Sequence, residues 1–267
     1  MTPARPPTAA MKRSRQPPGK PFICQDRGEV SLHFGMATVQ SRMRVGAPTK
    51  LVLDYTRSMM AFLLLKPEPQ HIVMLGLGGG SLAKYCHERL PDTCFTALEI
   101  SPEVIAMREL FAIPPDDARL QVLCVDGAAW LRDNPSCCDV LMLDGFDAGG
   151  LPPQLCSQGF YDDCAAALAP GGVLASNIWA RDSLRDTIVE RLRRSFGDAV
   201  LTILAEDGEN TIALACKDAN LPSASLLRER ARRLTAQHPV ELEASASKLA
   251  LALADGATAN RLQTLES

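Results

Sequence analysis

Four acidic residues stand at or just after the ends of apolar runs that are typical of buried strands, with Asp147 three residues beyond Asp144. The carboxyl ends of parallel strands meet at one edge of an α/β sheet, so we expect these side chains to line a single cleft. An acid at a strand end can also simply cap the helix that follows, and capping explains Asp126 most easily. Four acids in the same position favour a binding site over capping alone. They are Glu99, Asp126, Asp144 and Asp147.

The four carboxylates suit different tasks. Glu99 can accept hydrogen bonds from both hydroxyls of a ribose, and Asp126 can accept one from the exocyclic amine of adenine. Asp144 and Asp147 would lie where the reactive end of such a nucleoside points, and a carboxylate pair there attracts a sulfonium or an alkylammonium ion. A carboxylate can also act as general base for an attacking amine, whose pKa of about 10 otherwise keeps it protonated.

A glycine-rich turn lies upstream of the acids. Gly76-Leu-Gly78-Gly79-Gly80 follows the apolar run 72–75, and a helix-like segment begins at Ser81. Glycine lets backbone N–H groups approach a ligand, and a helix N-terminus adds unpaired N–H groups and a partial positive charge. Glu99 follows Gly76 at about 20 residues, the offset at which an acid reaches a ribose. The turn alone could be a tight corner, but together with Glu99 it predicts a bound nucleoside without saying which one.

Short apolar runs alternate with helix-like segments from residue 70 onward. The runs lack strict alternation, which is typical of parallel strands covered on both faces. After them, a charged helix and a hairpin with the polar tip Glu206-Asp-Gly-Glu-Asn210 close the pattern, and Pro170-Gly171-Gly172 reads as a turn. This order predicts an α/β fold with a Rossmann-like, seven-stranded Class I methyltransferase-type sheet whose last strand is antiparallel. Strands are expected at 71–75, 94–99, 120–125, 139–143, 173–178, 199–205 and 211–216, and helices at 81–90, 102–111, 127–133, 157–168 and 182–195.

Three parts follow from the pattern. Residues 1–20, rich in Pro, Arg and Ala, read as a disordered tail. Residues 21–66 read as a small N-terminal β unit, with strands at 30–34 and 36–39, plus a linking helix at 51–65. Residues 67–267 read as the catalytic domain, with C-terminal helices over 222–256.

Composition narrows the class of protein. The 267 residues are 46% hydrophobic and 22% charged with a formal net charge of −3, so nothing global favours nucleic acid or an anionic membrane as partner. No apolar run approaches the ~20 residues of a membrane span, and the first twenty residues lack the apolar core of a secretory signal. Nine cysteines without Cys-x-x-Cys spacing favour a reducing cytoplasm. The four histidines lack partners at metal-ligand spacing, so no metal is expected.

Six segments together resemble the spermidine synthase (polyamine aminopropyltransferase) family, over about residues 30–216. They are Gly76-Leu-Gly-Gly-Gly80, Ala97-Leu-Glu-Ile-Ser-Pro-Glu-Val104, Val125-Asp-Gly-Ala128, Asp139-Val-Leu-Met-Leu-Asp144, Phe160-Tyr161 and Leu168-Ala-Pro-Gly-Gly-Val173. The resemblance implies a small N-terminal β domain, a homodimer, and S-adenosylmethionine or its decarboxylated form as cofactor. It also implies a small-molecule amine as acceptor.

Carried over by position, the resemblance assigns roles to individual residues. It makes Asp144 the catalytic carboxylate, and it places Asp147 and Tyr55 at the amine. Its cofactor-binding positions are Gly76, Gly78, Gly79, Gly80, Ser81, Glu99, Ile100, Asp126 and Gly127.

The chain also departs from the family pattern. Ser81 stands where the family has an acid that would repel the carboxylate of intact S-adenosylmethionine. Thr56-Arg57 replaces a His-Glu pair, and Arg57 would suit a cofactor carboxylate better than a polyamine. Gly145-Phe146 replaces two serines, and Ala148 replaces a proline.

Three functions therefore remain open. The Asp144–Asp147 pair favours an aminopropyltransferase, which we prefer. Ser81 and Arg57 favour a methyltransferase that uses intact S-adenosylmethionine. Loss of some family positions also allows a non-catalytic nucleoside-binding scaffold, although four retained acids argue against it. A nicotinamide-dependent dehydrogenase is weaker still, because no separate substrate domain follows the glycine turn.

Overall fold

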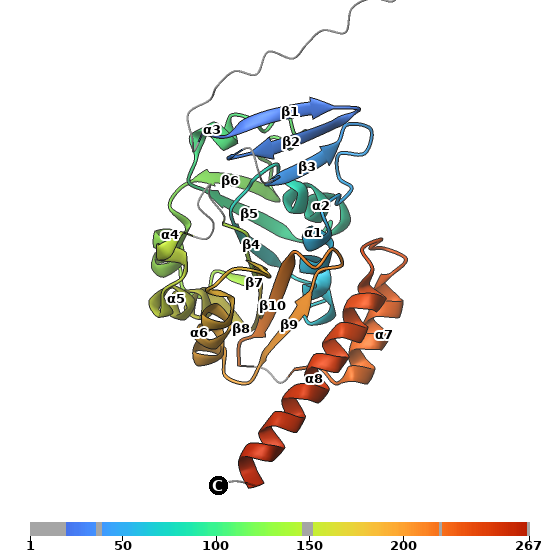
Figure 1. Cartoon of the computed structure of the whole chain (residues 1–267). Helices are drawn as coiled ribbons and strands as arrows, with labels where there is room; N and C mark the ends of the chain where they lie inside the picture. The colour runs from blue at the N-terminus through green and yellow to red at the C-terminus, as the bar shows by residue number, and fades with distance from the viewer. Residues whose placement is uncertain (1–19, 36–38, 146–151, 219–220, 266–267) are drawn as a thin grey trace, which may run out of the picture.

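The computed structural model describes residues 20–35, 39–145, 152–218 and 221–265, which form two sheets with their helices (Figure 1). The smaller sheet is antiparallel, in the order β1-β2-β3. Arg27 and Gly28 both adopt positive φ between its first two strands, the geometry of a two-residue hairpin turn. Its strands are β1 (Phe22–Asp26), β2 (Glu29–His33) and β3 (Ser41–Arg44).

The larger sheet has seven strands in the order β6-β5-β4-β7-β8-β10-β9. The first five are parallel, whereas β10 runs antiparallel to both of its neighbours. This arrangement confirms the predicted seven-stranded sheet and its antiparallel closing hairpin. The strand order reverses between β4 and β7, which is where α/β sheets bind ligands. The strands are β4 (His71–Leu75), β5 (Cys94–Glu99), β6 (Leu120–Cys124), β7 (Cys138–Leu143), β8 (Leu168–Trp179), β9 (Val200–Leu204) and β10 (Asn210–Cys216).

Helices cover both faces of the larger sheet, so successive residues of a central strand enter different cores. Along β4, Ile72 and Met74 pack in one buried cluster and Val73 and Leu75 in the other. The first face carries α1 (Asp54–Met59), the 3₁₀ helix η1 (Met60–Leu64), α2 (Ser81–Arg89), α7 (Ala224–Leu234) and α8 (Leu242–Leu265). The second carries α4 (Gly127–Asp133), α5 (Gln158–Ala167) and α6 (Arg185–Phe196).

Some predicted boundaries are wrong. The helix expected over 102–111 is regular only in α3 (Pro102–Ile105), and residues 106–112 continue as hydrogen-bonded turns that lead to the buried Phe111 and Ile113. Pro170-Gly171-Gly172 lies inside β8 rather than in a turn, since the N–H of Gly171 pairs with the carbonyl of Lys217. A one-turn 3₁₀ helix, η2 (Pro153–Leu155), precedes α5 and was not expected.

Other predictions hold in part or are not tested. The linking helix is helical only from Asp54, and the C-terminal helical stretch is interrupted between α7 and α8, where Pro239 cannot continue a helix. Residues 36–38 of the expected 36–39 strand, and nearly all of the expected tail, lie outside the described residues.

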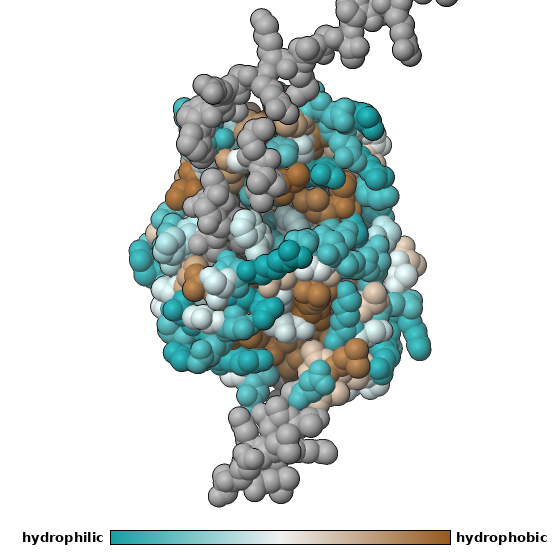
Figure 2. All heavy atoms as spheres, viewed as in Figure 1, coloured by the Kyte–Doolittle hydropathy of each residue, from teal (hydrophilic) through white to brown (hydrophobic). Residues whose placement is uncertain are grey.

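The surface shows no single dominant apolar face in the view of Figure 2, where hydrophilic residues separate the hydrophobic patches. Within the described ranges, no helix is both long and apolar enough to cross a membrane.

Candidate active site

Asp144 lies at the carboxyl end of β7, beside the switch in strand order. The hydroxyl of Tyr55, on α1, donates a hydrogen bond to Asp144 Oδ2 at 3.0 Å. The same hydroxyl lies 3.3 Å from the carbonyl oxygen of Gln40, but its one proton favours the closer, charged acceptor. The structure thus brings together two of the residues that the sequence placed at the reaction centre.

The other oxygen of the Asp144 carboxylate is also held. Asn177 Nδ2, on β8, donates to Asp144 Oδ1 at 2.8 Å. Asn210 Nδ2, at the start of β10, donates in turn to Asn177 Oδ1 at 2.8 Å, which fixes the orientation of the first amide. The sequence analysis missed both asparagines. Their signal was a polar side chain at the end of an otherwise apolar strand.

Burial and hydrogen bonding act on the pKa of Asp144 in opposite directions. Burial disfavours the charged form and raises the pKa above the usual range of a carboxyl, while the donors Asn177 and Tyr55 lower it again. Burial is the largest effect, so the net pKa is raised. The pKa of Tyr55 is raised well above that of a free tyrosine, first by burial and then by the charge of Asp144. Tyr55 therefore stays a donor, and Asp144 is a stronger base than an exposed aspartate.

A cavity of about 360 Å³ opens beside these groups. Four carboxylates and one guanidinium line it, and the guanidinium of Arg181 lies 3.7 Å from the carboxylate of Glu209. The excess of negative charge favours a ligand with more than one positive charge. The lining residues are Val39, Gln40, Leu53, Tyr55, Asp144, Asn177, Trp179, Arg181, Asp182, Asp207, Glu209 and Asn210.

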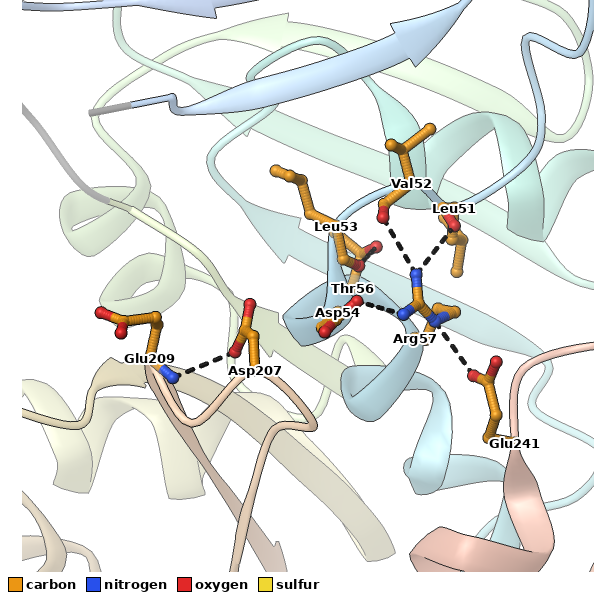
Figure 3. A network of polar contacts seen from close by, with 9 residues as sticks. All are labelled: Leu51, Val52, Leu53, Asp54, Thr56, Arg57, Asp207, Glu209 and Glu241. Carbon is orange, nitrogen blue, oxygen red and sulfur yellow. Dashed lines mark hydrogen bonds and ion pairs between the residues drawn. The ribbon is translucent and has the colours of Figure 1, made fainter. Parts of the chain in front are cut away.

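The outer acids of this cavity come from the tip of the β9–β10 hairpin. Asp207 Oδ1 accepts a hydrogen bond from the backbone N–H of Glu209 at 3.0 Å, which Figure 3 shows as the link between the two residues. Gly208 between them has a φ of +74°, which glycine adopts without strain. The sequence analysis identified this tip only as a polar turn, because nothing in the sequence says that it faces Asp144.

Glu99 lies next to the glycine turn, and only 8% of its surface is exposed. Its Oε2 accepts from the backbone N–H of Leu77 and its Oε1 from that of Ser101, both at 2.9 Å. The carboxylate therefore links the turn to the start of α3. The neighbouring Ile100 is 64% exposed, an unusual position for a large apolar side chain beside a buried acid.

The glycines of the turn are needed by the packing of the protein itself. A Cβ on Gly76, whose φ is +92°, would overlap the carbonyl oxygen of Asp144. On Gly79 it would lie 2.6 Å from Ser41 Oγ, and on Gly80 2.5 Å from the side chain of Ile113. Ligand binding is thus not required to explain these three glycines. At Gly78 the nearest atom would be 3.8 Å away, so this glycine has the most room.

Asp126 and Gly127 also have structural tasks. Asp126 Oδ1 accepts from the backbone N–H groups of Ala128 and Ala129, at 2.9 and 3.1 Å, so this acid caps α4. A Cβ on Gly127 would lie 2.7 Å from the side chain of Leu75. The capping that the sequence left open for Asp126 is present, and both capping bonds use one carboxylate oxygen.

The structure corrects the expectation for Arg57. Its guanidinium forms ion pairs with Asp54 and with Glu241, the latter at 3.0 Å, and it donates to the carbonyl oxygens of Leu51 and Val52 (Figure 3). It thus joins the start of α1 to the start of α8 instead of facing a cofactor carboxylate.

Ser81 and Asp147 are the remaining residues that the sequence placed in the site. Ser81 Oγ lies 3.4 Å from Ser41 Oγ on β3, so the turn contacts the N-terminal sheet. Asp147, Phe146 and Ala148 lie outside the described residues. Within the residues that are described, no three His, Cys, Asp or Glu side chains are grouped so that they could hold a metal ion.

The sequence is similar to that of a curated polyamine aminopropyltransferase from Chromobacterium violaceum. The two are 36% identical over 213 residues, which cover 79% of this chain and 82% of the relative. No family model matches the chain.

Two solved structures share the fold. A probable spermidine synthase from Corynebacterium glutamicum superposes with a TM-score of 0.67 at 20% identity, covering 82% of this chain and 88% of the other. Human methyltransferase-like protein 13, solved in complex with SAH, superposes with a TM-score of 0.63 at 25% identity, covering 70% and 93%.

Proposed function

Because this chain belongs to the polyamine aminopropyltransferase family, we propose that it transfers an aminopropyl group from decarboxylated S-adenosylmethionine to a polyamine. The observation that carries the proposal is the Asp144 carboxylate, held by Tyr55 and Asn177 at the head of an acidic cavity. A part-buried carboxylate that is oriented on both oxygens beside a cavity is the arrangement that a general base requires.

The acceptor amine enters as a cation, and the cavity supplies carboxylates that can bind its ammonium groups. The outer carboxylates of Asp182, Asp207 and Glu209 attract a distal ammonium group, while Asp144 receives the reacting one. When bound, the sulfonium substrate supplies a C–S bond that breaks as the amine nitrogen bonds to the neighbouring carbon, and the electron pair stays on sulfur. Asp144 accepts the proton that the nitrogen must lose, a step that its raised pKa assists. We place Asp147 as the second carboxylate at the amine.

The residues around the glycine turn suit the adenosyl part. The Glu99 carboxylate has about four acceptor sites, and the two backbone N–H groups occupy only part of this capacity, so ribose hydroxyls can bind as well. The capping bonds of Asp126 use Oδ1, which leaves Oδ2 for an adenine amine. Ile100 offers an exposed apolar surface to the base. We propose that the backbone of Gly76, Gly78, Gly79, Gly80 and Ser81, with that of Gly127 at the start of α4, completes the site.

Methyl transfer from intact S-adenosylmethionine is the second candidate, and Ser81 is the observation that favours it. The family acid at this position would repel the carboxylate of that molecule, and serine does not. The second argument for this function is lost, because Arg57 binds elsewhere.

One experiment separates the two reactions. The purified protein is incubated with each form of S-adenosylmethionine and a panel of amines, and the nucleoside product is identified by mass spectrometry. We expect methylthioadenosine from the decarboxylated form with a diamine or triamine. Formation of S-adenosylhomocysteine from the intact form, without methylthioadenosine, would replace the proposal by the methyltransferase.

The oligomeric state and the cellular compartment are also proposals. We propose a homodimer, which the family resemblance implies and which light scattering can test. No disulfide joins any of the nine cysteines, all of which lie in the described part of the chain, and this suits a reducing compartment such as the cytoplasm.

A further inference from the structure

A second cavity, of about 580 Å³, lies between the segment that leads from β3 into α1, the end of α2 and the connection between α7 and α8. It shares no lining residue with the acidic cavity beside Asp144. Its size is that of a small-molecule site. The charged side chains that line it are Arg44, Lys50, Arg57, Arg89 and Glu241.

The charge of this second cavity is opposite to that of the whole chain. Four cations and one acid line it, although the formal net charge of the protein is −3. The acid, Glu241, is already bound to Arg57, so these two largely cancel. The other three cations of the lining are Arg44, Lys50 and Arg89, and the acids that pair with the two arginines, Glu29 and Glu88, are not part of the lining.

The ion pairs of these three cations leave N–H donors available for a ligand. Arg44 is paired with Glu29 at 3.4 Å, yet 52% of its side chain is exposed. Among the described residues, the ion-pair partner of Arg89 is the adjacent Glu88, and 43% of the arginine side chain is exposed. Lys50 forms no ion pair within the described part of the chain. A guanidinium has five N–H donors and an ammonium has three, so one carboxylate does not satisfy either arginine.

The rest of the lining is mostly apolar, and consists of Ala47, Thr49, Leu51, Val52, Pro239 and Val240. Tyr85 also lines the cavity, and its buried hydroxyl is bonded to His238 Nδ1 at 3.2 Å. Cations that line the same partly apolar cavity repel one another more strongly than they would in open water. A ligand with several closely spaced negative charges relieves this repulsion and takes up the free donors.

We infer that this second cavity binds a small polyphosphate anion, either inorganic or carried by an organic molecule. Arg and Lys side chains are the groups that proteins use for phosphate, with arginine binding two oxygens at once. The inference is separate from the proposed transferase function, because it concerns other residues and is tested by binding alone.

Isothermal titration calorimetry of the full-length protein with inorganic tripolyphosphate tests the inference. We expect one binding site per chain, weakened about tenfold for each cation removed in Lys50→Gln/Arg89→Gln. The matched control is Arg132→Gln/Arg194→Gln, which removes the same charge from α4 and α6, where each arginine is paired with a local acid. The control should bind as the wild type does, and thermal unfolding should show that all three proteins are folded.

Three results would overturn the inference: no binding, binding that the Lys50/Arg89 pair does not affect, or equal weakening in the control. The last would mean attraction by general charge alone. ATP as a second probe separates the two sources of phosphate. Tighter binding than tripolyphosphate, lost in the same variant, indicates an organic phosphate, whereas equal affinity indicates that the phosphate chain alone is recognised.

Discussion

The hydroxyl of Tyr55 meets the carboxylate of Asp144 across 3.0 Å, although 89 positions separate the two residues in the chain. Tyr55 belongs to the helix that links the N-terminal sheet to the larger sheet, and Asp144 to the end of a central strand. The contact makes the linking segment part of the proposed reaction centre. The N-terminal part of the chain also lines the acidic cavity, through Val39, Gln40, Leu53 and Tyr55.

Replacement of Asp144 by asparagine should abolish turnover while the nucleoside still binds. Asparagine keeps the shape and can still accept from Tyr55, but it cannot take a proton from the amine. We expect a loss of about 10²–10⁴-fold in kcat, with the affinity for methylthioadenosine within about threefold of wild type by calorimetry. Asp133→Asn, on the exposed end of α4, is the control and should be fully active. Normal turnover by the Asp144 variant would remove this residue from the mechanism.

Replacement of Tyr55 by phenylalanine should shift the pH profile of the reaction toward higher pH. The hydrogen bond from Tyr55 lowers the pKa of Asp144, so its loss lets burial raise that pKa further. The unprotonated base is the active form, and the acidic limb of the kcat profile should therefore shift to higher pH. Tyr85→Phe is the matched control, because its hydroxyl contacts His238 instead. An unshifted limb in the Tyr55 variant would show that the contact does not tune Asp144.

The sheet and the central carboxylate could be predicted from the sequence because each depends on a short, continuous stretch of residues. The strands β4 and β5 begin and end where their apolar runs do, and Asp144 follows such a run directly. The partners of Asp144 are a different matter. Asn177 and Asn210 meet it only because β8 lies beside both β7 and β10, and that neighbourhood is a property of the fold.

The contacts of Arg57 likewise could not be predicted from the local sequence. Its position suggested a cofactor contact, yet its ion-pair partner Glu241 comes from a helix start 184 residues later. The glycine turn was predicted correctly as a turn, but the neighbours that make Gly79 and Gly80 necessary are Ser41, Phe111 and Ile113. Tertiary packing and ligand approach both select glycine, and a single sequence does not separate them.

The hairpin acids should affect the KM for the amine more than kcat. Asp207 and Glu209 line the outer cavity, away from the bond that reacts. Because hairpin-tip charges are screened by water, we expect Asp207→Asn/Glu209→Gln to raise KM about threefold to tenfold, with the difference shrinking at high salt. Asparagine at 207 keeps the oxygen that accepts from the turn. Glu206→Gln is the control, since Glu206 lines a different small cavity. A fall in kcat at unchanged KM would contradict this role.

Gly76→Ala should destabilise the protein and disturb the site together. The new methyl group would overlap the carbonyl of Asp144 at a backbone conformation that alanine avoids. We expect a loss of about 3–5 kcal/mol in the free energy of unfolding, from overpacking and positive φ combined. Gly28→Ala is the control, because it also has positive φ but no atom within 4 Å of the new Cβ. Gly28→Ala should lower the free energy of unfolding by about 1–2 kcal/mol. Equal losses in chemical denaturation would show that the contact with Asp144 is unimportant.

The titration of Lys84 should be visible in the stability of the whole protein. Lys84 lies on α2 with 2% of its surface exposed, and its ammonium donates to the carbonyl of Phe111 at 2.5 Å and to the sulfur of Met43 at 3.1 Å. Burial without a carboxylate partner lowers its pKa from 10.5 to about 8. It thereby joins β3 and α2 to the segment that packs on the glycine turn.

The sign of the pH effect follows from this lowered pKa. Between about pH 8 and 10.5 the unfolded chain keeps a proton on Lys84 that the folded protein has lost, so the free energy of unfolding rises with pH. The slope from this group is at most about 1.4 kcal/mol per pH unit. Lys84→Met should remove that rise and make the profile flatter, whereas Lys20→Met, at an exposed position, should leave it unchanged. Urea denaturation at intervals across this range measures the profiles. If the wild type and Lys84→Met run parallel, the ammonium is charged in the folded protein throughout, and its hydrogen bonds to Phe111 and Met43 outweigh the cost of burial.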